Sequence, residues 1–286
     1  MKVSVLVPVY NSEDTIYNCI RSIMKQTYQD FEIIVANDGS TDLTESRLEK
    51  YKKHFANKLH VYHCDHQGVA ATRNTLLKHA TGDYIMFVDA DDMISENILE
   101  VMVNKLEHYQ SDVVICGNDF NGVFGLKNTV EKEMIPSRRE VMKYLLKDTK
   151  IRNFSWGKLY RRSIWEGIYF PLGELFEDVS TVHKVLIKSK KTVIIPDVLY
   201  HYNIQSKGSI THSLRTEILP YMIQSFESEA RNILEFDPTL EKEVKRMLTR
   251  NKLIALLSLV RHMDFDGKVL HTIMRKENIQ LTVNKN

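Results

Sequence analysis

The sequence predicts an α/β fold with a Rossmann-like, mostly parallel sheet, followed by a C-terminal helical region. Short apolar and β-branched runs alternate with segments of helical periodicity over residues 1–116, which is the rhythm of βαβ units. Clusters of polar turn residues follow these runs at 10–14, 37–42 and 89–92. No strand-like run follows residue 214, so we expect helices from there to the end of the chain.

The first part of the chain consists of strand and helix pairs. Asn11 or Ser12 can cap the first helix, and Ser95 can cap the last one. Gly82 is expected to end a helix as its C-terminal glycine. We expect strands at 3–9, 31–36, 59–64, 84–88 and 112–116, with helices ending near 26, 54, 80 and 109. Because crossovers between parallel strands are right-handed, the loops after these strands meet at the edge where ligands bind.

The pattern is less regular beyond residue 118. Ser137 and Glu140 match a capping box that opens a helix, and Glu177 with Asp178 precedes another helical segment. We expect a helix at 137–148, an extended segment at 154–160, a helix through 182–186, and strands at 192–195 and 199–202. A boundary near residue 214 separates a domain of residues 1–214 from a helical region of residues 215–286.

Composition narrows the classes of function. The 286 residues have a formal net charge of only +2, so no overall field attracts nucleic acid, and we expect no nucleic-acid partner. The three cysteines are widely spaced without a Cys-x-x-Cys pair, which favours a reducing compartment. The N-terminal apolar run is too short for a signal peptide, and no run of about 18 apolar residues occurs. We therefore expect a cytoplasmic protein, with any membrane contact made at the inner face.

The sharpest local feature is a group of three carboxylates, Asp89, Asp91 and Asp92, directly after an apolar strand. Such crowding is costly unless a cation or hydrogen-bond donors compensate it. Carboxylate oxygens suit Mg²⁺ or Mn²⁺, and one or two of them with phosphate and water is the usual way to hold Mg²⁺. The alternative is a solvated loop in which Asp92 or Ser95 caps the next helix. The position after a buried strand, at the ligand edge, favours the metal.

Two further residues at this edge are candidates for binding a base. Asp38 follows the end of the second strand and can accept a hydrogen bond from a uracil ring, although a turn or cap role is the alternative. Tyr10 ends the first strand and offers a flat face for stacking, although it can equally be a half-exposed aromatic residue. Asp42 fits the capping role better than Asp38 does.

Taken together, these motifs resemble family 2 glycosyltransferases of the type A fold, in both order and spacing. The resemblance covers about residues 1–212. Any single motif is weak, and the ordered set is specific. The matching segments are 5–11 (VLVPVYN), 26–28 (QTY), 32–42 (EIIVANDGSTD), 71–74 (ATRN), 87–92 (FVDADD), 156–162 (WGKLYRR), 176–178 (FED) and 199–202 (LYHY).

The resemblance implies an inverting transferase that takes a hexose or N-acetylhexosamine from a UDP-sugar. It implies that Asp91 binds the Mn²⁺ or Mg²⁺ that bridges the diphosphate, and that Asp178 is the catalytic base. Trp156 and Glu177 would lie on the acceptor or donor-sugar side. The implied donor nucleotide-binding residues are Pro8, Tyr10, Asn11, Asp38, Arg73, Asp89 and Ala90, with Pro8, Tyr10 and Asp38 around the uracil and Asp89 at the ribose.

The chain departs from the family pattern after the strand at 199–202. Many relatives place a histidine or arginine a few residues later, and here His201 or His212 would be the extra metal ligand, with Lys207 as a phosphate contact. A histidine within a strand is more often a packed core residue. The Gln-x-x-Arg-Trp signature of processive polymer synthases is absent, which favours addition of one sugar or a few.

The acceptor and the role of the tail stay open at this level. The acceptor would be a glycan, a lipid-linked molecule or a protein, in the synthesis of cell-surface glycan, teichoic acid, capsule or glycoprotein. Basic residues and a leucine-rich stripe at 242–276 favour helices that pack on the catalytic domain or on a second copy over docking to a membrane surface. The competing functions are a nucleotidyltransferase, which lacks its usual glycine-rich phosphate loop here, and a non-catalytic sugar-nucleotide-binding or scaffold protein.

Overall fold

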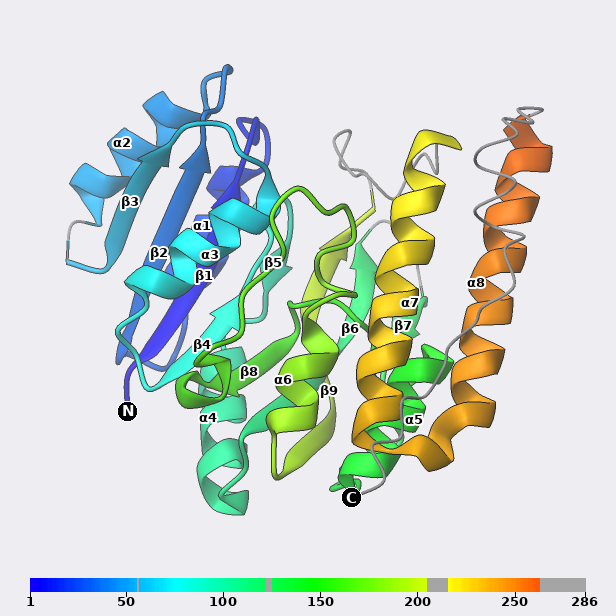
Figure 1. The fold of residues 1–286 in the computed structure, drawn as a ribbon. Helices are drawn as coiled ribbons and strands as arrows, with labels where there is room; N and C mark the ends of the chain where they lie inside the picture. Colours follow the sequence, from blue (N-terminus) through cyan, green and yellow to red (C-terminus); the bar gives the residue numbers. More distant parts are fainter. Residues whose placement is uncertain (56, 122–124, 205–215, 263–286) are drawn as a thin grey trace.

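The computed structural model describes residues 1–55, 57–121, 125–204 and 216–262. Strands and helices alternate through most of this length, and two long helices end it (Figure 1). In chain order the elements are β1 (Val3–Val9), α1 (Ile16–Met24), β2 (Phe31–Asp38), α2 (Thr44–His54), β3 (Leu59–Cys64), α3 (Val69–His79), β4 (Tyr84–Phe87), β5 (Met93–Ile94), α4 (Ile98–Tyr109), β6 (Val113–Asn121), β7 (Lys127–Asn128), α5 (Arg138–Lys147), β8 (Lys158–Arg161), η1 (Arg162–Trp165), α6 (Val182–Lys188), β9 (Thr192–Asn203), η3 (Thr216–Ile218), α7 (Leu219–Phe236), η4 (Pro238–Leu240) and α8 (Glu241–His262).

The strands of the described residues form one sheet in the order β3-β2-β1-β4-β8-β6-β9-β5, with β7 paired to β6. Strands β1 to β4 are mutually parallel, as the alternating pattern of the sequence predicts. Strand β8 then enters antiparallel between β4 and β6, while β6 and β9 run parallel. The sheet therefore joins a parallel half, built from consecutive strands of the chain, to a mixed half built from residue 93 onward.

Alternation along β1 divides the core into two layers. Val3, Val5, Val7 and Val9 belong to the cluster that also holds buried residues of α1 and α4. Leu6 points the other way, into the cluster formed with α3, α5, α6, α7 and α8. Helices α1 and α4 cover one face of β1 and α3 covers the other, so residues on both faces are buried, which is why the strand reads as a continuous apolar run. The result is a sheet covered by helices on both faces.

The last two helices pack against the body of the domain. Helices α7 and α8 lie side by side at one edge of the molecule (Figure 1). Ala230 and Ile233 of α7 and Leu248 of α8 share a buried cluster with Val141 of α5 and Val185 of α6. This packing agrees with the packing interpretation of the tail for residues 219–259. Within the described part of the chain, no helix combines the length and the apolarity needed to cross a membrane.

The early strands are confirmed, whereas three helix-boundary predictions are wrong. Helix α1 starts at Ile16 rather than at Asn11 or Ser12. Asn11 lies in the left-handed region with φ 44°, and the Ser12 hydroxyl donates to the Tyr10 backbone oxygen instead of capping the helix. Helix α4 starts at Ile98, and Ser95 instead donates or accepts a hydrogen bond with a histidine of β9. Gly82 has no positive φ. A Cβ there would come within 2.7 Å of β1 backbone, so close approach is the reason for glycine.

In the second half, the capping box of Ser137 and Glu140 is confirmed in full. The two strands expected at 192–195 and 199–202 are one strand, β9. The ladder with β6 shifts register opposite Pro196, which has no N–H to donate, and the strand continues beyond this bulge. The boundary near residue 214, Lys207 and His212 lie outside the described residues.

Candidate active site

Arg73 of helix α3 is the centre of the site. Its side chain is buried and its Nη1 donates to Glu177 and, at 3.0 Å, to Asp178 Oδ1. Its Nη2 donates to Asp89 Oδ1 at 3.1 Å. Burial alone would lower the pKa of Arg73, but the carboxylates of Asp178, Glu177 and Asp89 raise it above its ordinary value. One permanent cation thus joins the loop after β4 to the segment before α6.

Local backbone features bring these groups together. Gly68 precedes α3 with φ 89°, a conformation that favours glycine, and Arg73 follows from the first turns of that helix. Phe176 has φ 63°, which is rare for a bulky residue and costs conformational energy. This turn places the next two side chains, Glu177 and Asp178, toward Arg73. The strained residue lies two positions before Asp178, the residue implied as the base.

Asp178 is held on both of its carboxylate oxygens. Oδ1 accepts from Arg73, and Oδ2 accepts from the backbone N–H of Ser155 at 3.2 Å. Burial raises the pKa of Asp178 to about 7, since the lowering effect of Arg73 is offset by the like charges of Glu177 and Asp89. The side chain keeps 16% of its surface accessible. A partly accessible carboxyl group with a pKa near neutrality has the properties of a general base.

The carboxylate cluster after β4 divides into different roles. Asp92 is fully buried, and its two oxygens accept from Tyr200 Oη at 2.6 Å and from the backbone N–H of Asn203 at 2.8 Å. Burial, together with the charges of Asp89 and Asp91, raises the pKa of Asp92 to about 8. Tyr200 Oη also accepts from the Asp89 backbone N–H at 3.2 Å. Asp92 therefore ties the loop to β9 rather than facing a ligand.

The remaining two carboxylates of this loop suit a hard divalent cation. Asp89 and Asp91 are only partly buried, whereas Asp92 between them and β9 is engaged by protein donors. In the part of the chain that the structure describes, no three or more His, Cys, Asp or Glu side chains form a ready metal site. The donor set fits Mg²⁺ or Mn²⁺ held by one or two carboxylates, with the other ligands supplied by diphosphate and water.

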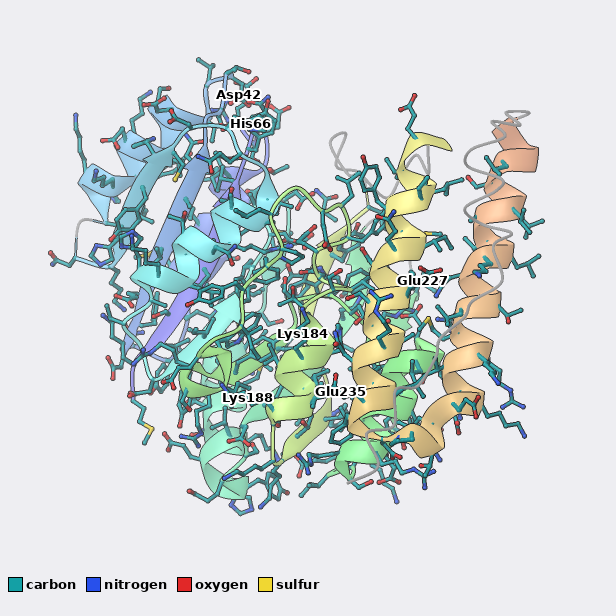
Figure 2. All side chains as sticks on the ribbon, viewed as in Figure 1. Asp42, His66, Lys184, Lys188, Glu227 and Glu235 are labelled. Carbon is teal, nitrogen blue, oxygen red and sulfur yellow. The ribbon has the colours of Figure 1, made fainter. Side chains whose placement is uncertain are left out.

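The residues implied to bind the uracil meet at the end of the parallel strands. Asp38 is buried, and its two oxygens accept the backbone N–H groups of Gln67 and Gly68, each at 2.9 Å. The ring of Tyr10 stacks on His66 with centroids 4.3 Å apart. Figure 2 shows His66 at the upper end of these strands, next to the label of Asp42. Asp38 thus shapes the loop that carries His66 against Tyr10.

The other nucleotide-binding predictions fall on the same edge. Asn11 bridges two strand-end loops, because its N–H donates to Ser40 Oγ at 2.9 Å and its Oδ1 accepts from Thr41 N–H at 2.8 Å. Pro8 is buried in β1 opposite residue 36 of β2, and Ala90 is buried within the carboxylate loop. At these positions Asn11, Pro8 and Ala90 could contact a bound nucleotide through their backbone atoms or short side chains.

Two predicted site residues have structural partners instead. Trp156 is buried between Phe154 and Tyr200, with ring centroids 4.5 Å from each. His201 has both ring nitrogens engaged, Nε2 with Ser95 Oγ at 2.9 Å and Nδ1 with Asp119 at 3.0 Å. A metal role for His201 would require it to leave these partners, so the geometry favours the packed interpretation of this histidine.

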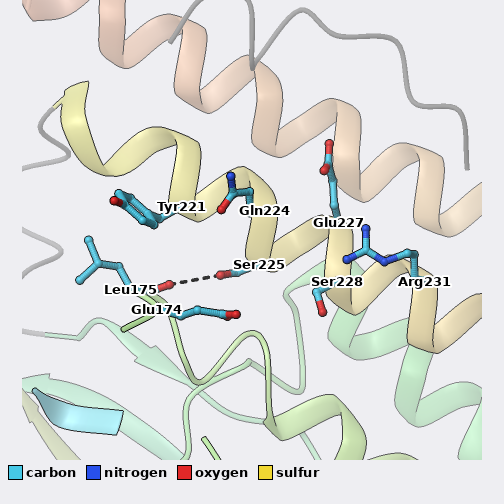
Figure 3. A pocket seen from close by; sticks show the side chains of 8 residues that line it. All are labelled: Glu174, Leu175, Tyr221, Gln224, Ser225, Glu227, Ser228 and Arg231. Carbon is cyan, nitrogen blue, oxygen red and sulfur yellow. Dashed lines mark hydrogen bonds between the residues drawn. The ribbon is translucent and has the colours of Figure 1, made fainter. Parts of the chain in front are cut away.

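A polar pocket lies beside the segment that contains the candidate base. It has a volume of about 320 Å³ and opens between residues 174–175 and helix α7 (Figure 3). Ser225 Oγ on α7 donates to the backbone oxygen of Leu175 at 3.2 Å and joins the two walls. Its lining includes Glu174, Tyr221, Gln224, Ser228 and Arg231. The lining is rich in groups that exchange hydrogen bonds with hydroxyls.

Comparison with known proteins decides the family. The protein-family model described as glycosyl transferase family 2 matches residues 4–168 of this chain. The chain belongs to glycosyltransferase family 2. The structure of Staphylococcus aureus TarS residues 1–349 superposes with a TM-score of 0.69 at 26% identity, covering 93% of this chain and 74% of that one. The fold is therefore the type A glycosyltransferase fold, and the chain is a glycosyltransferase.

Curated relatives extend the family assignment. The chain is 32% identical over 268 residues to the putative glycosyltransferase EpsH of Bacillus subtilis, covering 90% of this chain and 76% of EpsH. It is 29% identical over 253 residues to the glycosyltransferase GlyA of Streptococcus pneumoniae, covering 85% of this chain. The match spans only 36% of the length of GlyA.

Several residues of this glycosyltransferase site were not found by sequence reasoning. Tyr200 donates a buried hydrogen bond to Asp92 behind the carboxylate loop, and Ser155 supplies the N–H that binds Asp178. His66 stacks on the tyrosine that was expected to meet the base. The only sequence signal for Tyr200 and Ser155 was their place in or beside the motifs at 199–202 and 156–162. Motif membership alone does not show which backbone group faces the site.

Proposed function

We propose that this family 2 glycosyltransferase is inverting and metal-dependent, and that it transfers a hexose or N-acetylhexosamine from a UDP-sugar to a hydroxyl acceptor. The observation that carries the proposal is Asp178, a partly accessible carboxyl group with a pKa of about 7, held by Arg73 beside Asp89. This arrangement links a base to the loop expected to bind the ribose and the diphosphate. It is the arrangement that a single displacement requires.

The donor assignment rests on the nucleotide edge and on a structural relative. The structure of S. aureus TarS 1–349 in complex with UDP-GlcNAc superposes with a TM-score of 0.67 at 25% identity, covering 82% of this chain and 71% of that one. In this chain Asp38 and Tyr10 lie where parallel strands end, which is the edge at which ligands of such sheets bind. We assign Asp38 and Tyr10 to binding the uracil and Asp89 to binding the ribose. We assign Asn11 and Ala90 to further contacts with the donor nucleotide.

The chemistry follows from the division of roles between two carboxylates, Asp178 as the base and Asp91 as the metal ligand. The acceptor oxygen attacks the anomeric carbon while the bond to the diphosphate oxygen breaks, and UDP leaves with the electron pair. Asp178 accepts the proton that the hydroxyl loses. Asp91 would hold Mg²⁺ or Mn²⁺, which would supply positive charge to stabilise the leaving diphosphate. One displacement on the face opposite the leaving group inverts the anomeric carbon.

Arg73 has two tasks in this scheme. It keeps the carboxylates of Asp178 and Glu177 near each other despite their like charge, and it connects them to Asp89. Occupation of Asp89 by a ribose would alter the charge that Arg73 shares with Asp178. The rigid, planar guanidinium holds three carboxylates at once, which a lysine ammonium cannot do in the same geometry.

The acceptor side lies toward the pocket between residues 174–175 and α7. Its lining of Glu174, Gln224 and Ser228 suits a hydroxyl-rich acceptor such as a sugar or polyol. The acceptor would then belong to cell-surface glycan, teichoic acid, capsule or glycoprotein synthesis. In this proposal the domain of residues 1–214 binds the donor and supplies the base, while α7 and α8 of the C-terminal region pack beside it and α7 shapes the acceptor side.

The test is turnover of a panel of sugar nucleotides with Mn²⁺ present. We expect release of UDP from a UDP-hexose or UDP-N-acetylhexosamine, and an inverted anomeric configuration of the product by NMR. Turnover of GDP-sugars alone would refute the donor assignment. Binding without turnover across the panel and a set of glycan and polyol acceptors would favour a non-catalytic protein, and release of pyrophosphate would indicate a nucleotidyltransferase.

A further inference from the structure

The backbone of Ser155 controls one half of the candidate base. Asp178 Oδ1 is bound by Arg73, whereas Oδ2 faces the Ser155 N–H at 3.2 Å and Ser155 Oγ at 3.5 Å. A hydrogen bond from a backbone N–H lowers the pKa of a carboxyl group and fixes its orientation. The position of the Ser155 peptide therefore sets both the direction and the basicity of Oδ2.

Each peptide group around Ser155 is itself held from the protein interior. The buried ammonium group of Lys158 donates to the backbone oxygens of Phe154 and Trp156. Tyr160 Oη donates to the Ser155 oxygen at 3.1 Å. Burial lowers the pKa of Lys158 to about 8. These contacts hold the segment from within the sheet, and they leave its N-terminal end at residue 153 to be held elsewhere.

That end is held by a buried acid of helix α7. Asn153 Nδ2 donates to Glu229 Oε1 at 3.1 Å, and Glu229 is fully buried. Among the described residues, Glu229 Oε2 and Asn153 Oδ1 are both buried without a hydrogen-bond partner. Burying two acceptor oxygens without hydrogen-bond donors raises the free energy of the folded state. A protonated Glu229 would present an O–H to the amide oxygen, and acid and amide would then pair through two hydrogen bonds.

The charges around Glu229 are consistent with a neutral acid. Burial raises its pKa to about 8, against the lowering effect of the hydrogen bond from Asn153. Of the charged neighbours, Asp148 at the end of α5 raises the pKa and Arg250 of α8 lowers it. At pH 7 Glu229 is therefore mostly protonated, the state in which it can both accept from and donate to Asn153.

We propose that residues 153–156 (NFSW) form a clamp on the carboxylate of Asp178, and that Glu229 is a positioning residue that anchors this clamp from helix α7. The inference rests on the proposed role of Asp178 as the base. It gives the C-terminal helices a part in the chemistry, although Glu229 lies outside residues 4–168, which match the family model. Glu229 acts through Asn153 and Ser155 and contacts neither substrate nor donor.

Breaking the anchor should change the base in a defined direction. Without Glu229 the segment loses its hold at residue 153, and the Ser155 N–H moves away from Asp178. The pKa of Asp178 should then rise by about 0.5–1 unit, because one stabilising hydrogen bond is weakened. Turnover at pH 7 should fall roughly 10- to 100-fold, the effect of a displaced catalytic group. The KM for the donor should change little.

The experiment compares Glu229→Leu, Glu229→Gln and the control Asn232→Ala. Gln keeps one donor and one acceptor for Asn153, so it should restore the wild-type pKa and turnover. Asn232 is also on α7 and bonds His183 at 2.8 Å, so its removal costs a similar interhelix hydrogen bond without touching the clamp. The pKa of Asp178 is read from its carboxyl carbon by NMR as pH is varied. Turnover is read as UDP release from UDP-N-acetylglucosamine with Mn²⁺.

The outcomes separate the clamp from the role of the base. A raised Asp178 pKa in Glu229→Leu, restored in Glu229→Gln and absent in Asn232→Ala, supports the clamp. Asn153→Ala, at a half-buried position, should show the same rise and replaces Glu229→Leu if that variant does not fold. An unchanged pKa in Asn153→Ala, or a rise in Glu229→Gln as large as in Glu229→Leu, overturns the clamp. If Asp178→Asn keeps wild-type turnover, the proposed base is wrong, while the NMR readout still judges the clamp.

Discussion

The rate of transfer should depend steeply on pH between 6 and 8. The pKa of Asp178 is raised to about 7 by burial and by the charges of Glu177 and Asp89, against the opposing effect of Arg73. A general base acts in its deprotonated form, so activity must rise with pH. With a pKa near 7, roughly a tenth of Asp178 is ionised at pH 6 and roughly nine tenths at pH 8. We therefore expect kcat/KM for UDP release to rise about tenfold over this interval.

Two variants test whether the rising limb of the pH–rate profile reports the ionisation of Asp178. Asp178→Asn should lower kcat by about 10²–10⁴-fold and remove the limb, with donor affinity little changed. Glu177→Gln should move the limb to lower pH, because removing a like charge lowers the pKa of Asp178. A wild-type profile that is flat from pH 6 to 8, or a limb that persists in Asp178→Asn, would refute the reasoning.

Three further predictions concern the metal ligand Asp91, the uracil site and the packing of the sheet. Asp91→Ala should abolish Mn²⁺-dependent turnover with an unchanged circular dichroism spectrum, and near-normal activity in EDTA would contradict the metal assignment. Calorimetry should show UDP binding more tightly than GDP, with Asp38→Asn weakening UDP by displacing the loop at Gly68; tighter binding of GDP would count against the uracil site. Gly82→Ala should destabilise the protein by about 1–3 kcal/mol in urea unfolding, because its Cβ meets β1 backbone at 2.7 Å; an unchanged midpoint would show that β1 can shift.

Local patterns in the sequence were enough to predict the parallel half of the fold. Strands β1 to β4 lie close to their expected positions, because apolar runs between polar turns have few other ways to be buried. The capping box at Ser137 was also correct, since both of its hydrogen bonds are made within four residues. The misplaced starts of α1 and α4 depended on Asn11 and Ser95, whose side chains bond to other loops and strands.

The connections within the site could not be predicted in the same way. Arg73 meets Asp178 across 105 positions of the chain, and no local pattern shows that contact. Asp92 belongs to the same motif as Asp89 and Asp91, yet it alone accepts a hydrogen bond from the Tyr200 hydroxyl of β9. The two strands expected around Pro196 are one strand, because the bulge opposite β6 tolerates a missing N–H. Tertiary partners decided each of these cases.

The order of the strands has a consequence for how the enzyme forms during synthesis. The parallel unit of β1 to β4 is complete once residue 87 has emerged, and its contacts are between neighbouring parts of the chain. Asp178 and its clamp arrive later, and they join through β8 and α7 from residues 158 to 236. Contacts of long sequence separation form slowly because loop closure costs entropy. A nascent chain would thus have the nucleotide edge in place before it can activate an acceptor hydroxyl.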